Sequence, residues 1–253
     1  MGMIRGLEKF KEKFSAYSHQ YVLIGGTACT VLMDEADMDF RATKDLDIVL
    51  YVEALDEQFV KAFWEFIKEG GYQNKQKSTE KNIFYRFLQP NNLEFPWMLE
   101  LFSRLPDGVT FYGEGKITPI PTNDEVTSLS AILLDDDYYS LVHEGTMLIG
   151  DLPILKPTHL IPLKVQAWSD LSSRKTEGEA VDSRDISKHK NDIFRLYQLL
   201  KADDLVTLPE KAKAAMTEFL EKMQSADINS KQLGLPNTSK EEILFNLGKI
   251  YPS

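Results

Sequence analysis

Residues 21–51 read YVLIGGTACTVLMDEADMDFRATKDLDIVLY, and two short motifs within this stretch decide the fold. The first motif is Gly25-Gly26-Thr27, which directly follows a short apolar run. Glycine permits a sharp turn and lets the backbone approach a ligand closely. The free N–H groups at the start of a helix form a site for an anion. We therefore expect a strand, a tight turn and a helix whose first turn faces a phosphate group.

The second motif is Asp45-Leu46-Asp47, which directly precedes another apolar run. Successive side chains of a strand point to opposite faces, so Asp45 and Asp47 share one face of the expected strand. Two carboxylates against an apolar layer repel each other and need a proton or a cation to neutralise them. Mg²⁺ prefers oxygen ligands and is commonly held by one or two carboxylates together with substrate phosphates. The pair therefore indicates a metal-dependent phosphate site.

A third acid lies on a later predicted strand, where Glu100 interrupts the otherwise apolar segment of residues 97–103. Two interpretations stay open. In one, this is an edge strand whose glutamate points to water. In the other, Glu100 is a third carboxylate that completes a metal site with Asp45 and Asp47.

The composition is that of an ordinary globular protein. The chain has 253 residues, 43% of them hydrophobic, which suits one large domain or two small ones. Its formal net charge of −10 argues against a broad nucleic-acid-binding surface but leaves room for a local basic groove. The single cysteine, Cys29, rules out an internal disulfide and fits a cytoplasmic location. We expect no membrane association, because no apolar run could span a bilayer and the charged N-terminal segment lacks a signal-peptide core.

Hydrophobic periodicity predicts the elements. We expect strands over residues 21–24, 45–52, 82–88 and 97–103, and helices over 5–18, 27–33, 56–69, 158–175, 185–201, 209–224 and 239–249. A hairpin is expected to join residues 138–143 to residues 146–155, after a solvent-exposed turn at residues 135–137. The result is an α/β (α+β) fold, with a mixed sheet flanked by helices in residues 1–155 and a helical domain in residues 156–253.

The sequence lacks the motifs of several other classes of enzyme and binding protein. The sequence contains no Walker A motif, no G-x-G-x-x-G and no G-x-S-x-G. The four histidines fall in no zinc-binding spacing, and Cys29 has no cysteine partner. The carboxylate pair is the only concentrated chemistry in the sequence.

The order of Gly25-Gly26, a short helix and Arg41-x-Thr43-x-Asp45-x-Asp47 resembles the nucleotidyltransferase superfamily of the DNA polymerase beta type. Within it, the chain is similar to the AbiEii/AbiGii toxin-like nucleotidyltransferases of bacterial toxin–antitoxin and phage-defence systems. The resemblance covers the first third of the chain and, more weakly, residues 155–200. It implies Mg²⁺- or Mn²⁺-dependent transfer of NMP from an NTP to a hydroxyl acceptor. That acceptor could be RNA in a local groove, such as a tRNA 3′ end, or a protein side chain. A cognate antitoxin would be a partner.

The resemblance assigns the three acids to catalysis. Asp45 and Asp47 would bridge two metal ions, and Glu100 would act on the acceptor hydroxyl as its base or through a metal ion. Such catalysis depends on positioning and charge neutralisation, because the protein does little covalent work.

Nucleotide binding would fall to residues around the acids. The backbone of Gly25 and Gly26 and the hydroxyl of Thr27 would contact the β- and γ-phosphates. Arg41 and Thr43 would brace the loop or contact a phosphate. The further candidates on the later helices are Lys164, Lys190 and Asp192.

The later helices leave alternatives open. Lys164 lies within an apolar stripe, so it either reaches the triphosphate or forms a structural ion pair. The segment of residues 188–192, with Lys190 and Asp192, either contacts nucleotide or is a solvated basic turn of a helix.

Two other functions stay open. One is nucleotidyl transfer to a small antibiotic of the aminoglycoside type, and the other is a non-catalytic relative that binds nucleotide or a partner protein. Convergence of Glu100 on Asp45 and Asp47 would favour catalysis. A basic groove beside the acids would favour RNA, and a small acidic pocket would favour a cationic drug.

Overall fold

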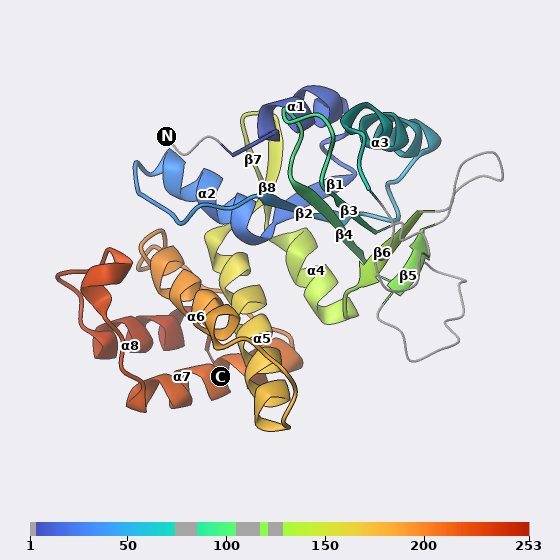
Figure 1. Cartoon of the computed structure of the whole chain (residues 1–253). Helices are drawn as coiled ribbons and strands as arrows, with labels where there is room; N and C mark the ends of the chain where they lie inside the picture. The colour runs from blue at the N-terminus through green and yellow to red at the C-terminus, as the bar shows by residue number, and fades with distance from the viewer. Residues whose placement is uncertain (1–3, 74–84, 105–116, 121–128, 253) are drawn as a thin grey trace.

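The computed structural model describes residues 4–73, 85–104, 117–120 and 129–252. Its architecture is a mixed sheet flanked by helices, as expected (Figure 1). The strands are β1 (Tyr21–Ile24), β2 (Asp45–Leu50), β3 (Arg86–Leu88), β4 (Met98–Ser103), β5 (Ile117–Ile120), β6 (Leu129–Leu133), β7 (Thr146–Ile149) and β8 (Leu152–Leu155). The α-helices are α1 (Leu7–Phe14), α2 (Gly25–Glu35), α3 (Glu57–Gly70), α4 (Asp136–Glu144), α5 (Pro157–Thr176), α6 (Ser183–Tyr197), α7 (Glu210–Ser225) and α8 (Lys240–Ile250). Two 3₁₀ helices are η1 (Ser15–Tyr17) and η2 (Ser230–Leu233).

The strands of the described residues form one sheet in the order β5-β6-β4-β2-β1-β8-β7, with β3 paired to β4 beside β6. Strand β1 runs antiparallel to β2 and parallel to β8, whereas β2 runs parallel to β4. The short helix α2 connects β1 to β2. This connection brings the Gly-Gly motif at the end of β1 next to the Asp-x-Asp motif at the start of β2.

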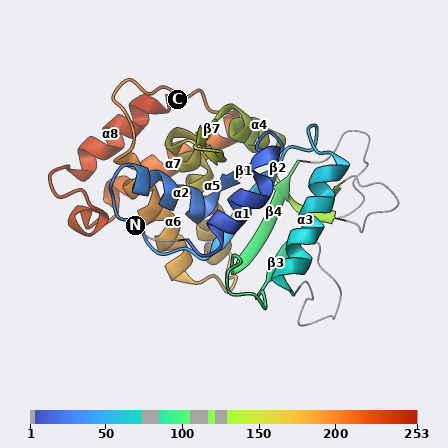
Figure 2. The same ribbon diagram turned by 90° about the horizontal axis from the view of Figure 1, so that it is seen from above.

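Helices α1 and α3 cover one face of the sheet, and the C-terminal helices lie on the opposite side (Figures 1 and 2). The covered face is packed with aromatic rings, among them Phe10, Phe14, Phe63 and Phe66, all at most 1% exposed. The Phe10 and Phe66 rings meet edge to face with centroids 5.8 Å apart. Burying such rings supplies much of the hydrophobic stabilisation of a small sheet.

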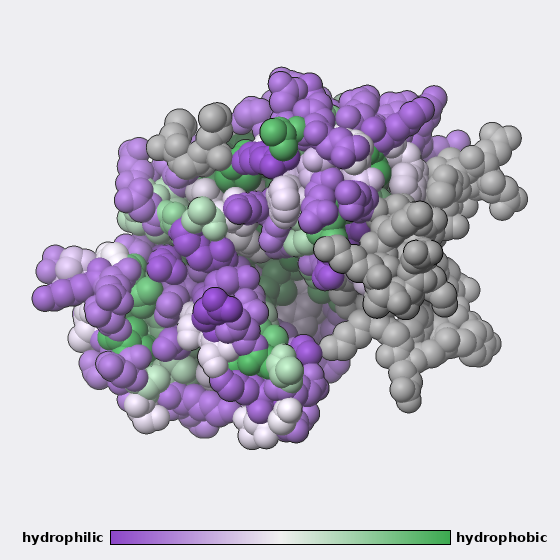
Figure 3. Space-filling view, in the orientation of Figure 1, coloured by the Kyte–Doolittle hydropathy of each residue, from purple (hydrophilic) through white to green (hydrophobic). Residues whose placement is uncertain are grey.

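Helix α5 is the central element of the C-terminal half. It packs against α6 and α7 and also contacts α2 of the sheet half. Its Trp168 ring lies edge to face on Phe219 of α7, with centroids 5.1 Å apart. One buried core runs from the sheet into these helices. The outer surface seen in Figure 3 is mainly hydrophilic, and no helix of the described residues is long and apolar enough to cross a membrane.

The predicted hairpin between residues 138–143 and residues 146–155 is wrong, because the first arm is a helix and the second arm is itself a hairpin of two strands. Residues 136–144 form α4, which begins at an N-cap where the Asp135 carboxylate accepts from the Asp137 N–H at 3.1 Å. The hairpin itself joins β7 to β8 through a turn at Gly150, whose φ is +59°. The buried residues of α4 recur with helical spacing. Together with the N-cap residue Asp135, this spacing could have predicted the helix.

Candidate active site

The three acids singled out from the sequence lie on one face of the sheet. In the parallel pair of β2 and β4, Asp47 stands directly opposite Glu100, and Asp45 stands opposite Met98. Side chains that face each other across a ladder point to the same side. Strand alternation adds Asp45 to the face of Asp47. Helix α2 packs on β1 and β2, and its first turn lies on the face that carries these acids.

The first turn of α2 lies directly against the Asp47 carboxylate. Gly25 has a φ of +68°, and a Cβ built on it would stand 1.7 Å from Asp47 Oδ2. A Cβ on Gly26 would stand 2.6 Å from the Thr43 hydroxyl oxygen. A side chain at either position would collide with Asp47 or Thr43, so both positions require glycine. Gly25 is required also because its positive φ is unfavourable for other residues. This packing places a carboxylate beside the positive end of a helix.

Burial and like charges raise the pKa of Asp47 to about 7. The burial effect is the largest, followed by the neighbouring Glu100 carboxylate, while Lys164 and Lys188 act in the opposite direction. Burial also raises the pKa of Asp45, against the charge of Lys188. The cluster thus favours gaining positive charge, whether as a proton or as a cation.

Glu100 has a cationic partner. It forms an ion pair with Arg86, its cross-strand neighbour on β3, and its side chain is only 12% exposed. Strand β4 is an inner strand, so the interpretation of an edge glutamate pointing to water is wrong. Within the described residues, no three His, Cys, Asp or Glu side chains stand close enough together to hold a metal ion. The acids share a face, but Glu100 is turned to Arg86.

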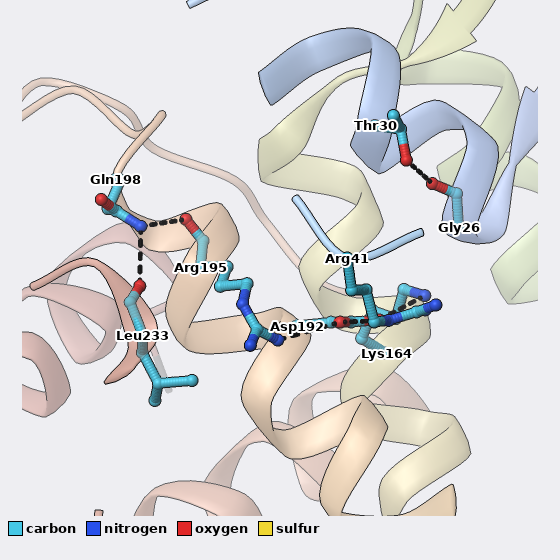
Figure 4. A network of polar contacts seen from close by, with 8 residues as sticks. All are labelled: Gly26, Thr30, Arg41, Lys164, Asp192, Arg195, Gln198 and Leu233. Atoms are coloured by element: carbon cyan, nitrogen blue, oxygen red, sulfur yellow. Dashed lines mark hydrogen bonds and ion pairs between the residues drawn. The ribbon is translucent and has the colours of Figure 1, made fainter. Parts of the chain in front are cut away.

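A buried ion cluster joins the sheet half to the C-terminal helices (Figure 4). Asp192 on α6 is fully buried and accepts two hydrogen bonds from Arg41, at 2.9 and 2.8 Å. Lys164 on α5 donates to the same carboxylate at 3.2 Å, and Arg195 lies 3.6 Å away. Burial by itself raises the pKa of Asp192, but the Arg41 hydrogen bonds and the Lys164 charge lower it below its usual value. Lys164 is therefore ion-paired, and it also lies near enough to lower the pKa of Asp47.

Thr27 has a structural role. Its side chain is fully buried, and its hydroxyl donates to the Asp45 backbone carbonyl at 2.7 Å. This bond fixes the start of β2 to the first turn of α2. The hydroxyl that the sequence assigned to a phosphate is thus engaged within the protein.

The charge that faces the acids from α6 comes from Lys188. Its electrostatic effect reaches both Asp45 and Asp47. Lys188 lies four residues before Asp192 and thus on the same side of the helix, whereas Lys190 lies about 200° around the helix axis from Asp192. Lys188 belongs to the predicted segment of residues 188–192, but the lysine predicted to bind nucleotide there is Lys190; helical spacing from Asp192 identifies Lys188 instead.

His189 is a second residue of the segment 188–192 for which the sequence predicts no role of its own. Its Nδ1 atom is buried and has no hydrogen-bond partner among the described residues. Burial, assisted by the charges of Lys164 and Lys188, lowers the pKa of His189 to about 4. The ring is therefore neutral at pH 7.

Comparison with solved structures yields distant likenesses. No family model and no curated protein matches the chain. It is similar to the crystal structure of a candidate nucleotidyltransferase from H. pylori, at 14% identity and a TM-score of 0.38, over 96% of this chain and 89% of that chain. It is also similar to JHP933 from Helicobacter pylori, at 14% identity and a TM-score of 0.36, over 96% and 86% of the two chains. Neither likeness is close enough to carry a function to this chain.

Proposed function

We propose that this chain is a metal-dependent nucleotidyltransferase that moves NMP from an NTP to a hydroxyl acceptor. One observation carries the proposal. Asp45, Asp47 and Glu100 share a face on adjacent strands, and the Asp47 carboxylate lies against the glycine-rich first turn of α2. Nucleotidyl transfer needs carboxylates for cations next to backbone donors for phosphates, and this juxtaposition supplies both kinds of group.

The donor chemistry suits Mg²⁺ or Mn²⁺. Carboxylate oxygens are the ligands that these ions prefer, and the raised pKa of Asp47, about 7, marks a position where added positive charge is favourable. Asp45 and Asp47 would hold the ion, and Glu100 would join them by exchanging its Arg86 partner. Bound there, the ion would neutralise phosphate charge and activate the acceptor hydroxyl.

The protein groups around the acids have separate tasks in this proposal. The N–H groups of the first turn of α2 bind phosphate oxygens. Lys188 offsets phosphate charge from α6, and Lys164 does so from α5. Asp192 positions Lys164 and Arg41 through the buried ion cluster. Thr27 keeps Asp45 aligned by its bond to the Asp45 carbonyl.

The acceptor is proposed to carry phosphate groups. The cations Arg41, Lys164 and Lys188 act on the acids, although the whole chain has a net charge of −10. This arrangement favours RNA over a cationic aminoglycoside, with a protein hydroxyl as a further acceptor to be screened. A role as a toxin with a cognate antitoxin partner belongs to the same proposal and rests on the sequence resemblance alone.

A second candidate is a non-catalytic nucleotide-binding relative. The ion pair of Glu100 with Arg86 favours it, because the third carboxylate is already neutralised within the protein. The two candidates differ in whether a nucleotidyl group is transferred.

Transfer is tested by incubating the protein with each α-³²P-labelled NTP, Mg²⁺ or Mn²⁺, and bulk RNA, protein or aminoglycoside acceptors. We expect label in one acceptor class with release of pyrophosphate, and none with the Asp45→Asn/Asp47→Asn variant. Metal-dependent NTP binding without label in any acceptor would favour the non-catalytic relative. Equal label with the variant would contradict both candidates.

A further inference from the structure

A pocket lies beside the buried ion cluster, on the side of the C-terminal helices. It has a volume of about 460 Å³ and is built by residues 33–41, the end of α6 and η2. Volumes of roughly 300–1,000 Å³ are usual for small-molecule sites. Asp45, Asp47 and Glu100 do not line this pocket, and Arg41 is its link to the proposed active site. The pocket is thus a separate place to bind a ligand.

The floor of the pocket is apolar. Met33 and Leu233 are buried there, and Met38 and Phe40 are half-buried. Thioether and aromatic side chains make favourable contacts with flat aromatic rings. The floor therefore suits a planar group such as a nucleobase.

Cations line the pocket. Arg41, Arg195 and Lys231 line it, against one acid, Asp39. The two guanidiniums are held on the Phe40 ring, with their carbon atoms 5.3 and 5.9 Å from its centroid. The buried Asp192 accepts from Arg41 and Lys164 and lies 3.6 Å from Arg195, so it compensates only part of the positive charge around the pocket and a surplus remains. Guanidinium groups match the geometry of phosphate oxygens.

The wall on the η2 side is fixed by hydrogen bonds (Figure 4). The Gln198 amide nitrogen donates to the Leu233 carbonyl at 3.1 Å and to the Arg195 carbonyl at 3.2 Å. Gly234 follows with a φ of +82°, and a Cβ there would stand 3.1 Å from the Gln198 oxygen. Gln198 and Gln232 also line the pocket, and amide groups can read the polar edge of a base.

We propose that this pocket binds a nucleoside phosphate, with the base against the half-buried Met38 and Phe40 and the phosphate on Arg195 and Lys231. The site needs no divalent ion, because its own cations neutralise the phosphate. It does not depend on the proposed transfer reaction. A free nucleotide and the end of a single-stranded RNA both present this chemistry, and the test separates them.

The test is calorimetric titration of the full chain in EDTA with AMP, adenosine, inorganic phosphate and a short oligoribonucleotide. We expect AMP to bind with a Kd below about 1 mM, and adenosine and phosphate each to bind at least about tenfold more weakly. The Arg195→Gln/Lys231→Gln variant should weaken AMP binding by about tenfold or more. Tighter binding of the oligoribonucleotide than of AMP would identify the end of an RNA strand as the ligand. Tighter binding of AMP would identify a free nucleotide as the ligand.

Two controls make the result specific. Arg184→Gln removes one positive charge from an exposed position at the start of α6, where the side chain is 91% exposed, and should leave AMP binding unchanged. Asp45→Asn/Asp47→Asn should also leave it unchanged, which distinguishes this site from the proposed metal site. No AMP binding by the folded wild type, binding of phosphate as tight as AMP, or an Arg195→Gln/Lys231→Gln variant that binds like the wild type would overturn the proposal.

Discussion

Among the described residues, Asp192 is the carboxylate that contacts the cations buried between α5, α6 and the segment before β2. It is fully buried and contacts Arg41, Lys164 and, at 3.6 Å, Arg195. Removing one partner from such a cluster leaves uncompensated charge in the interior. We expect Asp192→Asn to lower the free energy of unfolding by about 3–5 kcal/mol, measured by urea denaturation.

The same helix offers a matched control for this prediction. Asp182 caps α6 from an exposed position and pairs with Arg184. Asparagine also caps helices well, so Asp182→Asn should cost much less stability than Asp192→Asn. Similar losses in the two variants would show that Asp192 does not hold the cluster together.

Asp47 gives the protein a pH dependence of stability. Its carboxyl has a pKa of about 7 in the folded chain, raised by burial and by Glu100, against about 3.9 in an unfolded chain. Between these values the folded state binds more protons than the unfolded state, so this carboxyl destabilises the fold as pH rises. We expect Asp47→Asn to gain about 1–3 kcal/mol of stability relative to wild type between pH 5 and pH 8.

The measurement is denaturation of both proteins in EDTA at the two pH values. Comparing wild type with the variant cancels other titrating groups, including His189, whose lowered pKa works in the opposite direction. A stability difference between the two proteins that stays constant with pH would contradict the assigned shift. Addition of Mg²⁺ should reduce the difference, since a cation replaces the proton.

At the scale of elements, the start of α2 is the tightest junction of the fold. Gly25 adopts a φ of +68° and lies under the Asp47 carboxylate. Alanine at this position would be strained in its backbone and would displace Asp47. We expect Gly25→Ala to cost about 3 kcal/mol or more and to lower the pKa of Asp47 by exposing it, read by NMR titration.

A substitution at Gly178 separates the backbone strain of Gly25→Ala from the displacement of Asp47. It also has a positive φ, +91°, but nothing lies within 4 Å of a Cβ added there. Gly178→Ala therefore carries only the backbone strain, about 1–2 kcal/mol. Equal losses for Gly178→Ala and Gly25→Ala would mean that contact with Asp47 contributes nothing.

Elements that follow local rules were predicted from the sequence. Strand β1, the turn at Gly25 and the acid-bearing strand β2 appear where the motifs place them, because a strand–turn–helix junction depends on neighbouring residues. Helix α4 was not predicted, although its buried residues recur with helical spacing and Asp135 caps its first turn. Side-chain alternation placed Asp45 and Asp47 on one face correctly.

At the scale of the whole molecule, contacts between distant segments could not be predicted. Arg41 and Asp192 are 151 positions apart, and no periodicity links them. From the sequence, Lys164 could either contact a phosphate or form an ion pair. The packing of α5 against α6 shows the ion pair with Asp192. The Arg86 partner of Glu100 was likewise hidden, because strand register decides it. The predicted division into two domains at residue 155 stays a prediction. One buried core contains residues from both sides of that position.

The most direct test of the proposed active site is calorimetric binding of NTPs with and without Mg²⁺. It compares the wild type with Asp45→Asn/Asp47→Asn and with a control, Asp136→Asn/Asp137→Asn on the first turn of α4. We predict Mg²⁺-dependent binding by the wild type and the control, weakened at least about a hundredfold in the Asp45→Asn/Asp47→Asn variant. Mg²⁺-dependent binding of equal strength in all three proteins, or none in the folded wild type, would contradict a metal–nucleotide site at these carboxylates.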